Sequence, residues 1–238
     1  MDDWIDYYDS THTIYVSKLH RDVHFRVIAN DILGYVPSPD AVVLDYSCGE
    51  ALFADEVAAA CRQLILVEPA PGVRARLNER FGKNPRIVVR APEDLAAMPE
   101  ASVDLIAMVS VVQYMTRAEL DAALAVFRRL LKPDGRLALG DVIAPETGAA
   151  TDVAALLQFA ARNGFLVAAL TGLVRTALSD YSRLRASIGL KRYSKAEMVE
   201  ILRLAGLSGR HEARNMGHNA ARMTFVATPA PQPATPAR

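Results

Sequence analysis

The stretch of sequence that most constrains the fold of this chain lies at residues 42–61. Val42-Val43-Leu44 is an apolar run with two β-branched residues, and it ends on the carboxylate of Asp45. A loop of small residues follows, and residues 52–61 are rich in helix formers. A strand, a tight turn and a helix in this order are typical of an open parallel sheet, which presents backbone N–H groups and a helix N-terminus to a ligand.

A second apolar run, Leu64-Ile65-Leu66-Val67, ends on Glu68, nineteen residues after Gly49. A carboxylate at this distance suits an acceptor for the two hydroxyls of a ribose. The glycine-rich loop of nicotinamide-binding proteins reads G-x-G-x-x-G and requires no acidic residue before it. The loop here reads Asp-x-Ser-x-Gly-x-Ala from Asp45 to Ala51, which disfavours a nicotinamide-dependent oxidoreductase.

Three more strands are predicted downstream, at residues 86–90, 102–110 and 136–143. Asp141 stands near the end of the last of them, and ligands of open α/β sheets bind beyond the carboxyl ends of strands. A chain of 238 residues suits one α/β domain with an insertion better than two independent domains.

These features together resemble the class I S-adenosylmethionine-dependent methyltransferases. The first motif of that family reads Asp/Glu-x-Gly-x-Gly-x-Gly; this chain has Asp45 and Gly49, with Ser47 and Ala51 where the family usually has glycine. The other matching features follow in the family's order: Glu68, Glu93-Asp94, Asp104 and Lys132-Pro133-Asp134-Gly135. The resemblance covers residues 41–143 by motif and residues 193–227 by pattern.

The resemblance implies an α/β fold, a Rossmann-like, mostly parallel sheet of seven strands in the order 3-2-1-4-5-7-6 with helices on both faces. N-terminal helices and a helical lid are expected beside it. The expected parts of the chain are a helical cap (1–40), the cofactor-binding core (41–143), the lid (144–192), a last helix with an antiparallel strand pair (193–228) and a disordered tail (229–238). Helices are expected at residues 4–8, 18–33, 153–161 and 165–178.

The same resemblance implies S-adenosyl-L-methionine as the cofactor and S-adenosyl-L-homocysteine as its product. The residues expected to bind the cofactor are Tyr15, Asp45, Ser47, Cys48, Gly49, Glu68, Pro69, Glu93, Asp94, Ser110 and Val111, with Tyr8 as an alternative to Tyr15. The candidates for the catalytic, substrate-facing side are His24, His218, Asp141 and Tyr114, in no fixed order.

Histidine is a candidate base because it titrates near neutral pH. His20 and His24 share one face of the predicted helix, so metal binding, acid–base chemistry and plain packing all stay open for them. No spacing of His and Cys typical of a metal site appears in the sequence, and no metal is predicted.

Composition restricts the partners of the chain. Its 27 basic and 27 acidic residues give a formal net charge of zero, so neither nucleic acid nor an anionic membrane is expected to be attracted to it. The apolar stretch 165–174 is too short to span a bilayer; buried lid core, a dimer contact and docking on a membrane surface stay open for it. The acidic N-terminus lacks an apolar core, and the two cysteines favour a reducing, cytoplasmic location.

The sequence therefore predicts a methyltransferase that moves a methyl group to a small-molecule or lipid-like acceptor by direct displacement, acting as a monomer or homodimer. The alternative is a non-catalytic binding protein or partner subunit that keeps the fold with an altered cofactor loop. Transfer of an aminopropyl group is disfavoured, because the additional acidic motifs of that family are not found. The sequence does not identify the acceptor or the atom that is methylated.

Overall fold

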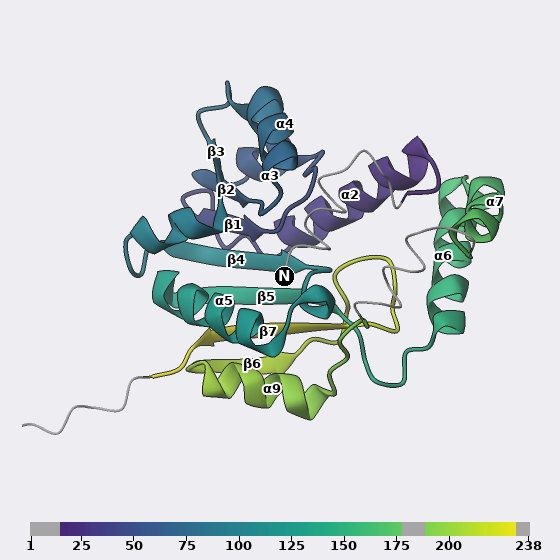
Figure 1. Cartoon of the computed structure of the whole chain (residues 1–238). Coiled ribbons are helices and arrows are strands. Elements are labelled where there is room, and N and C mark those ends of the chain that lie inside the picture. The colour runs from purple at the N-terminus through teal and green to yellow at the C-terminus, as the bar shows by residue number, and fades with distance from the viewer. Residues whose placement is uncertain (1–14, 178–188, 232–238) are drawn as a thin grey trace, which may run out of the picture.

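The apolar runs of the sequence form the central sheet of the protein. The structure is a computed structural model that describes residues 15–177 and 189–231 (Figure 1). The strands are β1 (Val42–Tyr46), β2 (Gln63–Val67), β3 (Ile87–Arg90), β4 (Val103–Val109), β5 (Leu131–Val142), β6 (Leu207–His211) and β7 (Met223–Pro229). Their order is β3-β2-β1-β4-β5-β7-β6, as expected. Strands β1 to β5 pair in parallel, and β7 runs antiparallel between β5 and β6.

Helices pack on both faces of this sheet (Figure 1). One core lies under α5 (Arg117–Leu130) and α9 (Lys195–Leu204). The other lies under α2 (Lys18–Leu33), α3 (Ala54–Ala59) and α4 (Pro71–Phe81). Two short 3-10 turns, η1 (Pro92–Ala97) and η2 (Val112–Tyr114), follow β3 and β4. The central strands read as continuous apolar runs because both of their faces are covered.

The lid expected after β5 is a pair of helices, α6 (Ala149–Asn163) and α7 (Leu166–Ala177). Phe159 and Ala160 of α6 pack with Phe165 and Ala169 in a small separate core, against partly buried residues such as Val23 of α2. The pair therefore joins the beginning of the chain to the segment after β5 (Figure 1). Within the described residues, no helix combines the length and the apolar character needed to cross a membrane.

Several boundaries differ from the sequence prediction, each for a local reason. The helix expected at residues 52–61 is only α3, because Ala51 has a left-handed backbone (φ 40°) that delays its start. Strand β5 begins at Leu131, directly after α5, and a register shift against β4 accommodates residues 132–135. Pro229, expected in a disordered tail, ends β7 because it pairs with Leu207 of β6.

Some predictions lie outside the described residues. These are the helix at residues 4–8, the alternative cofactor contact Tyr8, and residues 232–238 of the expected tail. The end of the lid segment, residues 178–188, lies outside them too.

Two motif residues, Asp104 and Lys132, hold the edge of the sheet at which the parallel strands begin. The Asp104 carboxylate accepts a hydrogen bond from the backbone N–H of Val42 at 2.8 Å. The same carboxylate forms an ion pair with Lys132 Nζ at 2.7 Å. Their place in the pattern therefore reflects the fold: they connect β1, β4 and β5 at the edge opposite the ligand-binding end.

We expect Asp104→Ala to lower the free energy of unfolding by about 1–3 kcal/mol, because the buried Val42 N–H loses its acceptor. Lys132→Met removes only a partly exposed ion pair and should cost about 1 kcal/mol or less. Urea denaturation of both variants measures the difference. Equal losses would show that the ion pair, and not the backbone hydrogen bond, carries the stabilisation.

Candidate functional site

The loop after β1 has an unusual backbone. Ser47, Gly49 and Ala51 all adopt left-handed conformations, with φ of 56°, 57° and 40°. These are the three positions at which the methyltransferase motif has glycine, and glycine adopts such angles without strain. The loop thus keeps the glycine conformation with two residues that each pay roughly 1 kcal/mol for it.

Glu68, at the end of β2, holds this loop in place. Its Oε2 accepts a hydrogen bond from Gly49 N at 2.9 Å, and its Oε1 accepts one from Ala70 N at 2.9 Å. The side chain is buried beside Asp45, the last buried residue of β1. Burial, together with the charge of Glu68, raises the pKa of Asp45 to about 7. The two acidic residues predicted to mark the cofactor site therefore lie together.

Helix α2 covers the loop. A Cβ added to Gly49 would lie 3.6 Å from the Phe25 ring, and Arg21 Nη1 donates to the Glu50 carboxylate at 3.4 Å. Cys48, in the middle of the loop, is buried with a free thiol, and burial raises its pKa well above the ordinary value. The Cys48 side chain is thus a neutral, apolar part of the loop.

A second strained pair stands at the ends of β4 and β5. Ser110 and Asp141 both have φ of 62°, and Ser110 Oγ donates a hydrogen bond to Asp141 Oδ2 at 2.7 Å. Left-handed angles at residues other than glycine persist where the surroundings enforce them, and they concentrate at functional sites. Val111, the next residue after Ser110, is buried and leads into η2, which contains Tyr114 with a half-buried ring.

Gln113, in η2, is buried, and its side chain points back toward Ser110 at the end of β4. Its Nε2 donates to the Ser110 backbone carbonyl at 2.7 Å. Its Oε1 is buried without a hydrogen-bond partner. A buried acceptor left without a donor costs free energy, so this oxygen is placed to receive a hydrogen bond from a ligand.

Asp141 belongs to a buried charge network that reaches the lid. Arg222 Nη1 forms an ion pair with Asp141 Oδ2 at 2.6 Å, and Arg222 Nη2 forms one with Asp152 of α6 at 3.1 Å. Asn215 Oδ1 accepts a hydrogen bond from Asp141 N at 3.1 Å. The Asp141 carboxylate is thus paired with both a guanidinium and a hydroxyl, and the network ties α6 to the end of β5.

His24 and His218 come together from distant parts of the chain. His24 lies on α2, His218 lies in the loop between β6 and β7, and their ring centroids are 6.3 Å apart. The Tyr15 ring lies 5.4 Å from His24, and the Phe159 ring stacks on His218 at 4.6 Å. Burial and the charge of His218 lower the pKa of His24 to about 3, and burial lowers that of His218. Both imidazoles are therefore neutral at pH 7, the form that accepts a proton or a hydrogen bond.

Asp31 bonds the helix that carries His24 to the loop that carries His218. This buried carboxylate on α2 accepts hydrogen bonds from Gly217 N and from Arg214 Nη2, both at 2.7 Å. Gly217 directly precedes His218, so the loop that carries one imidazole is bonded to the helix that carries the other.

His20 adds a third neutral imidazole. Burial, and secondarily the charge of His218, lowers its pKa to about 4. Its ring lies 6.5 Å from that of His24 and stacks on Phe165 at 4.9 Å. In the part of the chain that the structure describes, no group of three or more His, Cys, Asp or Glu side chains is arranged to hold a metal ion.

The structure brings most of the predicted site residues together at the carboxyl ends of the parallel strands. Pro69 follows Glu68 there, beside the loop that contains Cys48. Glu93 and Asp94 instead stand exposed at the start of η1, where Asp94 Oδ2 accepts a hydrogen bond from Ala91 N at 2.9 Å. Asp94 is therefore engaged in its own turn.

Sequence reasoning missed the residues that connect these groups. They are Asp31, Asp152, Phe159, Phe165 and Arg222. One signal was available: Arg222 directly precedes the apolar run of β7, a position where a buried cation requires a partner. The other contacts join residues distant in sequence and leave no local pattern.

Residues 44–139 match the protein family described as a methyltransferase domain. The fold is similar to that of DhpI in complex with SAH (TM-score 0.60, 13% identity, 96% of each chain covered). It is also similar to magnesium protoporphyrin IX methyltransferase (ChlM) from Synechocystis PCC 6803 with bound SAH (TM-score 0.56, 18% identity, 96% of this chain and 94% of that chain). Comparison with curated proteins gives no significant match.

A third similar structure is phosphoethanolamine N-methyltransferase 1 from Haemonchus contortus, in complex with phosphoethanolamine and S-adenosylhomocysteine. Its TM-score is 0.57 at 16% identity, over 98% of this chain and 49% of that chain. The resemblance found in the sequence is confirmed: residues 44–139 match the model of a methyltransferase domain, and the fold is that of the Rossmann-like methyltransferases.

A methyltransferase domain implies S-adenosylmethionine as its cofactor, and the residues present fit that molecule. The left-handed loop from Ser47 to Ala51 lets backbone approach a ligand closely. Glu68 lies at the end of β2, where ribose hydroxyls need acceptors, and each of its oxygens accepts one backbone N–H and keeps a second lone pair. The orphaned Oε1 of Gln113 supplies a further buried acceptor for an ammonium or hydroxyl group.

We expect Ala51→Gly to raise the free energy of unfolding by about 0.5 kcal/mol, because the relief of the left-handed strain exceeds the cost of the higher unfolded-state entropy of glycine. Ala54→Gly, three residues later at the start of α3, is the matched control and should lower it by about 1 kcal/mol. Urea denaturation separates the two signs. Equal destabilisation by both changes would refute the strain assigned to Ala51.

The buried His24 should make stability depend on pH. The unfolded imidazole takes up a proton below about pH 6.5, whereas the folded one stays neutral down to a pKa of about 3. The stabilisation is thus present above pH 6.5 and is lost as the pH falls. Between pH 7 and pH 5, the free energy of unfolding of the wild type should fall by about 2 kcal/mol more than that of His24→Gln.

Denaturation curves of both proteins at the two pH values measure this difference. The raised pKa of Asp45 acts in the opposite direction, since its protonated form is favoured in the folded state. That contribution is common to both proteins and cancels in the comparison. Parallel pH profiles for wild type and variant would contradict the burial of a neutral His24.

Proposed function

We propose that this chain transfers a methyl group from S-adenosylmethionine to a small-molecule or lipid-like acceptor by direct displacement. The premise is the match of residues 44–139 to a methyltransferase domain. The observation that carries the proposal is the pair of neutral imidazoles, His24 and His218, beside the strained ends of β4 and β5. A proton acceptor next to a methyl-donor site is what an O–H or N–H acceptor needs before it can attack.

The loop from Ser47 to Ala51 and the Glu68 carboxylate are proposed to hold the cofactor, with Ser110 and Val111 beside its reactive end. Tyr15, next to His24, is proposed to close the site from the N-terminal side. When bound, S-adenosylmethionine supplies an electrophilic methyl group on a sulfonium. The contribution of the chain is then alignment, exclusion of water and removal of one proton.

His218 is proposed as the proton acceptor, with His24 as its neighbour that orients the substrate. The Asp141 carboxylate opposes the effect of burial on the pKa of His218 and so favours the imidazolium that forms. Asp141 itself is proposed to position Ser110 and Arg222, because its carboxylate is already paired with both. Tyr114 is proposed to face the substrate from η2.

The proposed setting follows from composition and surface. A net charge of zero supports a small acceptor over nucleic acid. A reducing, cytoplasmic location and a monomer or homodimer remain proposals, as does contact with a membrane surface through α7. Its exposed apolar residues Val167 and Leu170 support such a contact.

The second candidate function is a non-catalytic binding protein or partner subunit. The observation in its favour is that Ser47 and Ala51 carry a Cβ at positions where the family has glycine, because a side chain limits how closely a ligand can approach the backbone. Both readings predict the same fold and differ in whether methyl transfer occurs.

Isothermal titration with S-adenosylmethionine and with S-adenosylhomocysteine tests the cofactor assignment. We expect binding in the micromolar range and a loss of about tenfold or more in Glu68→Gln, which replaces one acceptor oxygen by a donor. Glu146→Gln, an exposed change after β5, is the matched control. Thermal unfolding of both variants separates a lost ligand contact from a loosened loop.

An assay for S-adenosylhomocysteine release across a panel of acceptors then separates the two candidate functions. Release that is lost in His218→Gln, while cofactor binding is retained, supports the proposed transfer. Absence of heat with either ligand would refute the cofactor assignment. Cofactor binding without release across hydroxyl and amine acceptors would leave the binding protein as the better reading.

A further inference from the structure

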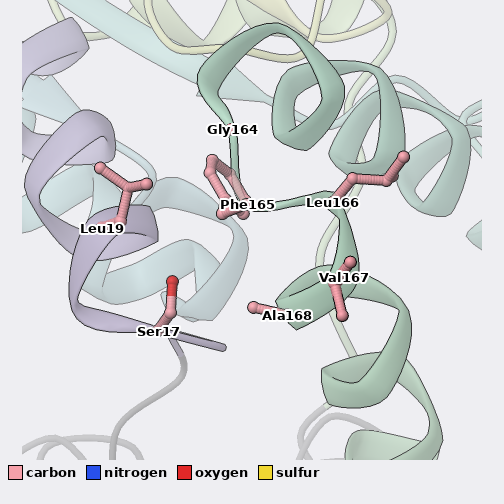
Figure 2. Close-up of a pocket in the computed structure, with 7 residues that line it drawn as sticks. All are labelled: Ser17, Leu19, Gly164, Phe165, Leu166, Val167 and Ala168. Atoms are coloured by element: carbon pink, nitrogen blue, oxygen red, sulfur yellow. The ribbon is translucent and has the colours of Figure 1, made fainter.

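The loop between β6 and β7, residues 212–222, lies between α2 and α6 (Figure 1). Helix α6 is held beside α2 by the small core that contains Phe159 and Phe165, and Figure 2 shows the Phe165 ring directed toward α2. His218 stands near the middle of the loop and is half-buried. Two helices from distant parts of the chain thus flank the segment that carries the proposed proton acceptor.

The two residues next to His218 in sequence are each bonded to a carboxylate of a different helix. Asp31 of α2 accepts a hydrogen bond from Gly217 N at 2.7 Å. Asp152 of α6 accepts one from Asn219 Nδ2 at 2.8 Å. Gly217 has a φ of 102°, a conformation that glycine adopts without strain, and this lets its N–H turn toward α2. The chain is therefore held on both sides of the imidazole.

Each helix also presents a ring to His218 from the same face as its carboxylate. His24 and Asp31 are seven residues apart on α2, about two helical turns, which puts both on one face. Asp152 and Phe159 have the same spacing on α6. The Phe159 ring stacks on His218 at 4.6 Å with an interplanar angle of 19°, whereas the His24 ring meets it edge-on at 71°. One face of each helix therefore holds both the loop and its imidazole.

Stability alone does not favour a carboxylate at position 31. Burial raises the pKa of Asp31 despite the hydrogen bond from Gly217 and the charge of Arg214, so its ionised form is costly in the folded protein. The Arg214 side chain is 83% exposed, and an ion pair to so exposed a partner contributes little. The chief contact of Asp31 is therefore with the backbone next to His218.

Asp152 affects His218 through its charge as well as through the loop. Burial lowers the pKa of His218 and the charge of Arg222 lowers it further, whereas the carboxylates of Asp141 and Asp152 raise it. Arg222 lies between these two carboxylates, 2.6 Å from Asp141 and 3.1 Å from Asp152. A carboxylate near an imidazole favours the imidazolium that forms when the ring takes up a proton.

We propose that Asp31 and Asp152 are positioning residues, which fix the orientation of the His218 imidazole and touch neither the cofactor nor the methyl acceptor. The inference rests on the proposed function, in which His218 is the proton acceptor. It gives the lid helix α6 a role in orienting this base, because Asp152 and Phe159 hold the loop from that side. Loss of either carboxylate should slow methyl transfer and leave cofactor binding unchanged.

NMR of the full-length chain, labelled with 13C and 15N in its five histidines, reads the orientation of His218 without any substrate. The stacked Phe159 ring should shift the ring protons of His218 upfield, and His218→Gln identifies their signals. Asp31→Ala and Asp152→Ala each free one side of the loop and should remove most of this shift. Asp31→Asn should keep it, because the amide oxygen still accepts a hydrogen bond from Gly217 N.

Asp104→Ala is the matched control for a general loss of stability. The Asp104 carboxylate also accepts a hydrogen bond from a backbone N–H, that of Val42, but at the opposite edge of the sheet. Its removal should leave the His218 signals in place. The Asp152 side chain is 19% exposed, so Asp152→Ala keeps the test decisive even where Asp31→Ala fails to fold.

Methyl transfer to an acceptor from the panel measures the effect on the reaction. Both alanine variants should lower kcat by about 10- to 100-fold, because a displaced catalytic group loses its alignment with the substrate. Their affinity for S-adenosylmethionine, measured by isothermal titration, should equal that of the wild type. Asp31→Asn should restore most of the rate, and Asp104→Ala should react as the wild type does.

Unchanged His218 signals in both alanine variants would overturn the inference, as would an equal loss of the shift in Asp104→Ala. A rate that is lost in His218→Gln but unchanged in both alanine variants would overturn it too, with the proposed function intact. If no acceptor is methylated while both alanine variants still move the His218 signals, the proposed function fails and the positioning of His218 by the two carboxylates is supported.

Discussion

The Glu68 carboxylate makes the contact on which the rest of the site depends. Strands β1 and β2 end side by side, and the loop after β1 leaves backbone N–H groups that need acceptors. Glu68 accepts a hydrogen bond from Gly49 N on one oxygen and from Ala70 N on the other. One side chain therefore bonds both the segment after β1 and the segment after β2. The left-handed loop can then persist with serine and alanine, and α2 packs on a surface that is already fixed.

Much of this arrangement could be predicted from the chain alone. The strand and loop at residues 42–51 follow from a local sequence pattern, whereas the strand order follows from the resemblance to the class I methyltransferases. The predictions failed where a contact spans the chain. The ion pair of Arg222 with Asp152, and the register that places Pro229 in β7, depend on how distant segments meet.

The site combines buried groups whose neutral forms are favoured. His20 and His24 stay uncharged because burial lowers their pKa values, and Asp45 holds its proton toward neutral pH because burial raises its own. The Arg222 network pairs the charges at the end of β5, where the guanidinium lies between the carboxylates of Asp141 and Asp152. Charged groups thus lie at the ends of β2 and β5, while the aromatic side next to the lid is neutral.

The bond between Asp31 and Gly217 has a consequence for how the site is assembled. The two residues are 186 positions apart, and Arg214 of the same loop bonds to the other oxygen of Asp31. The loop that follows β6 leads into β7, which lies between β5 and β6 in the sheet. The paired imidazoles therefore meet only where α2 and the β6–β7 pair both occupy their native positions, so the site depends on contacts between the two ends of the chain.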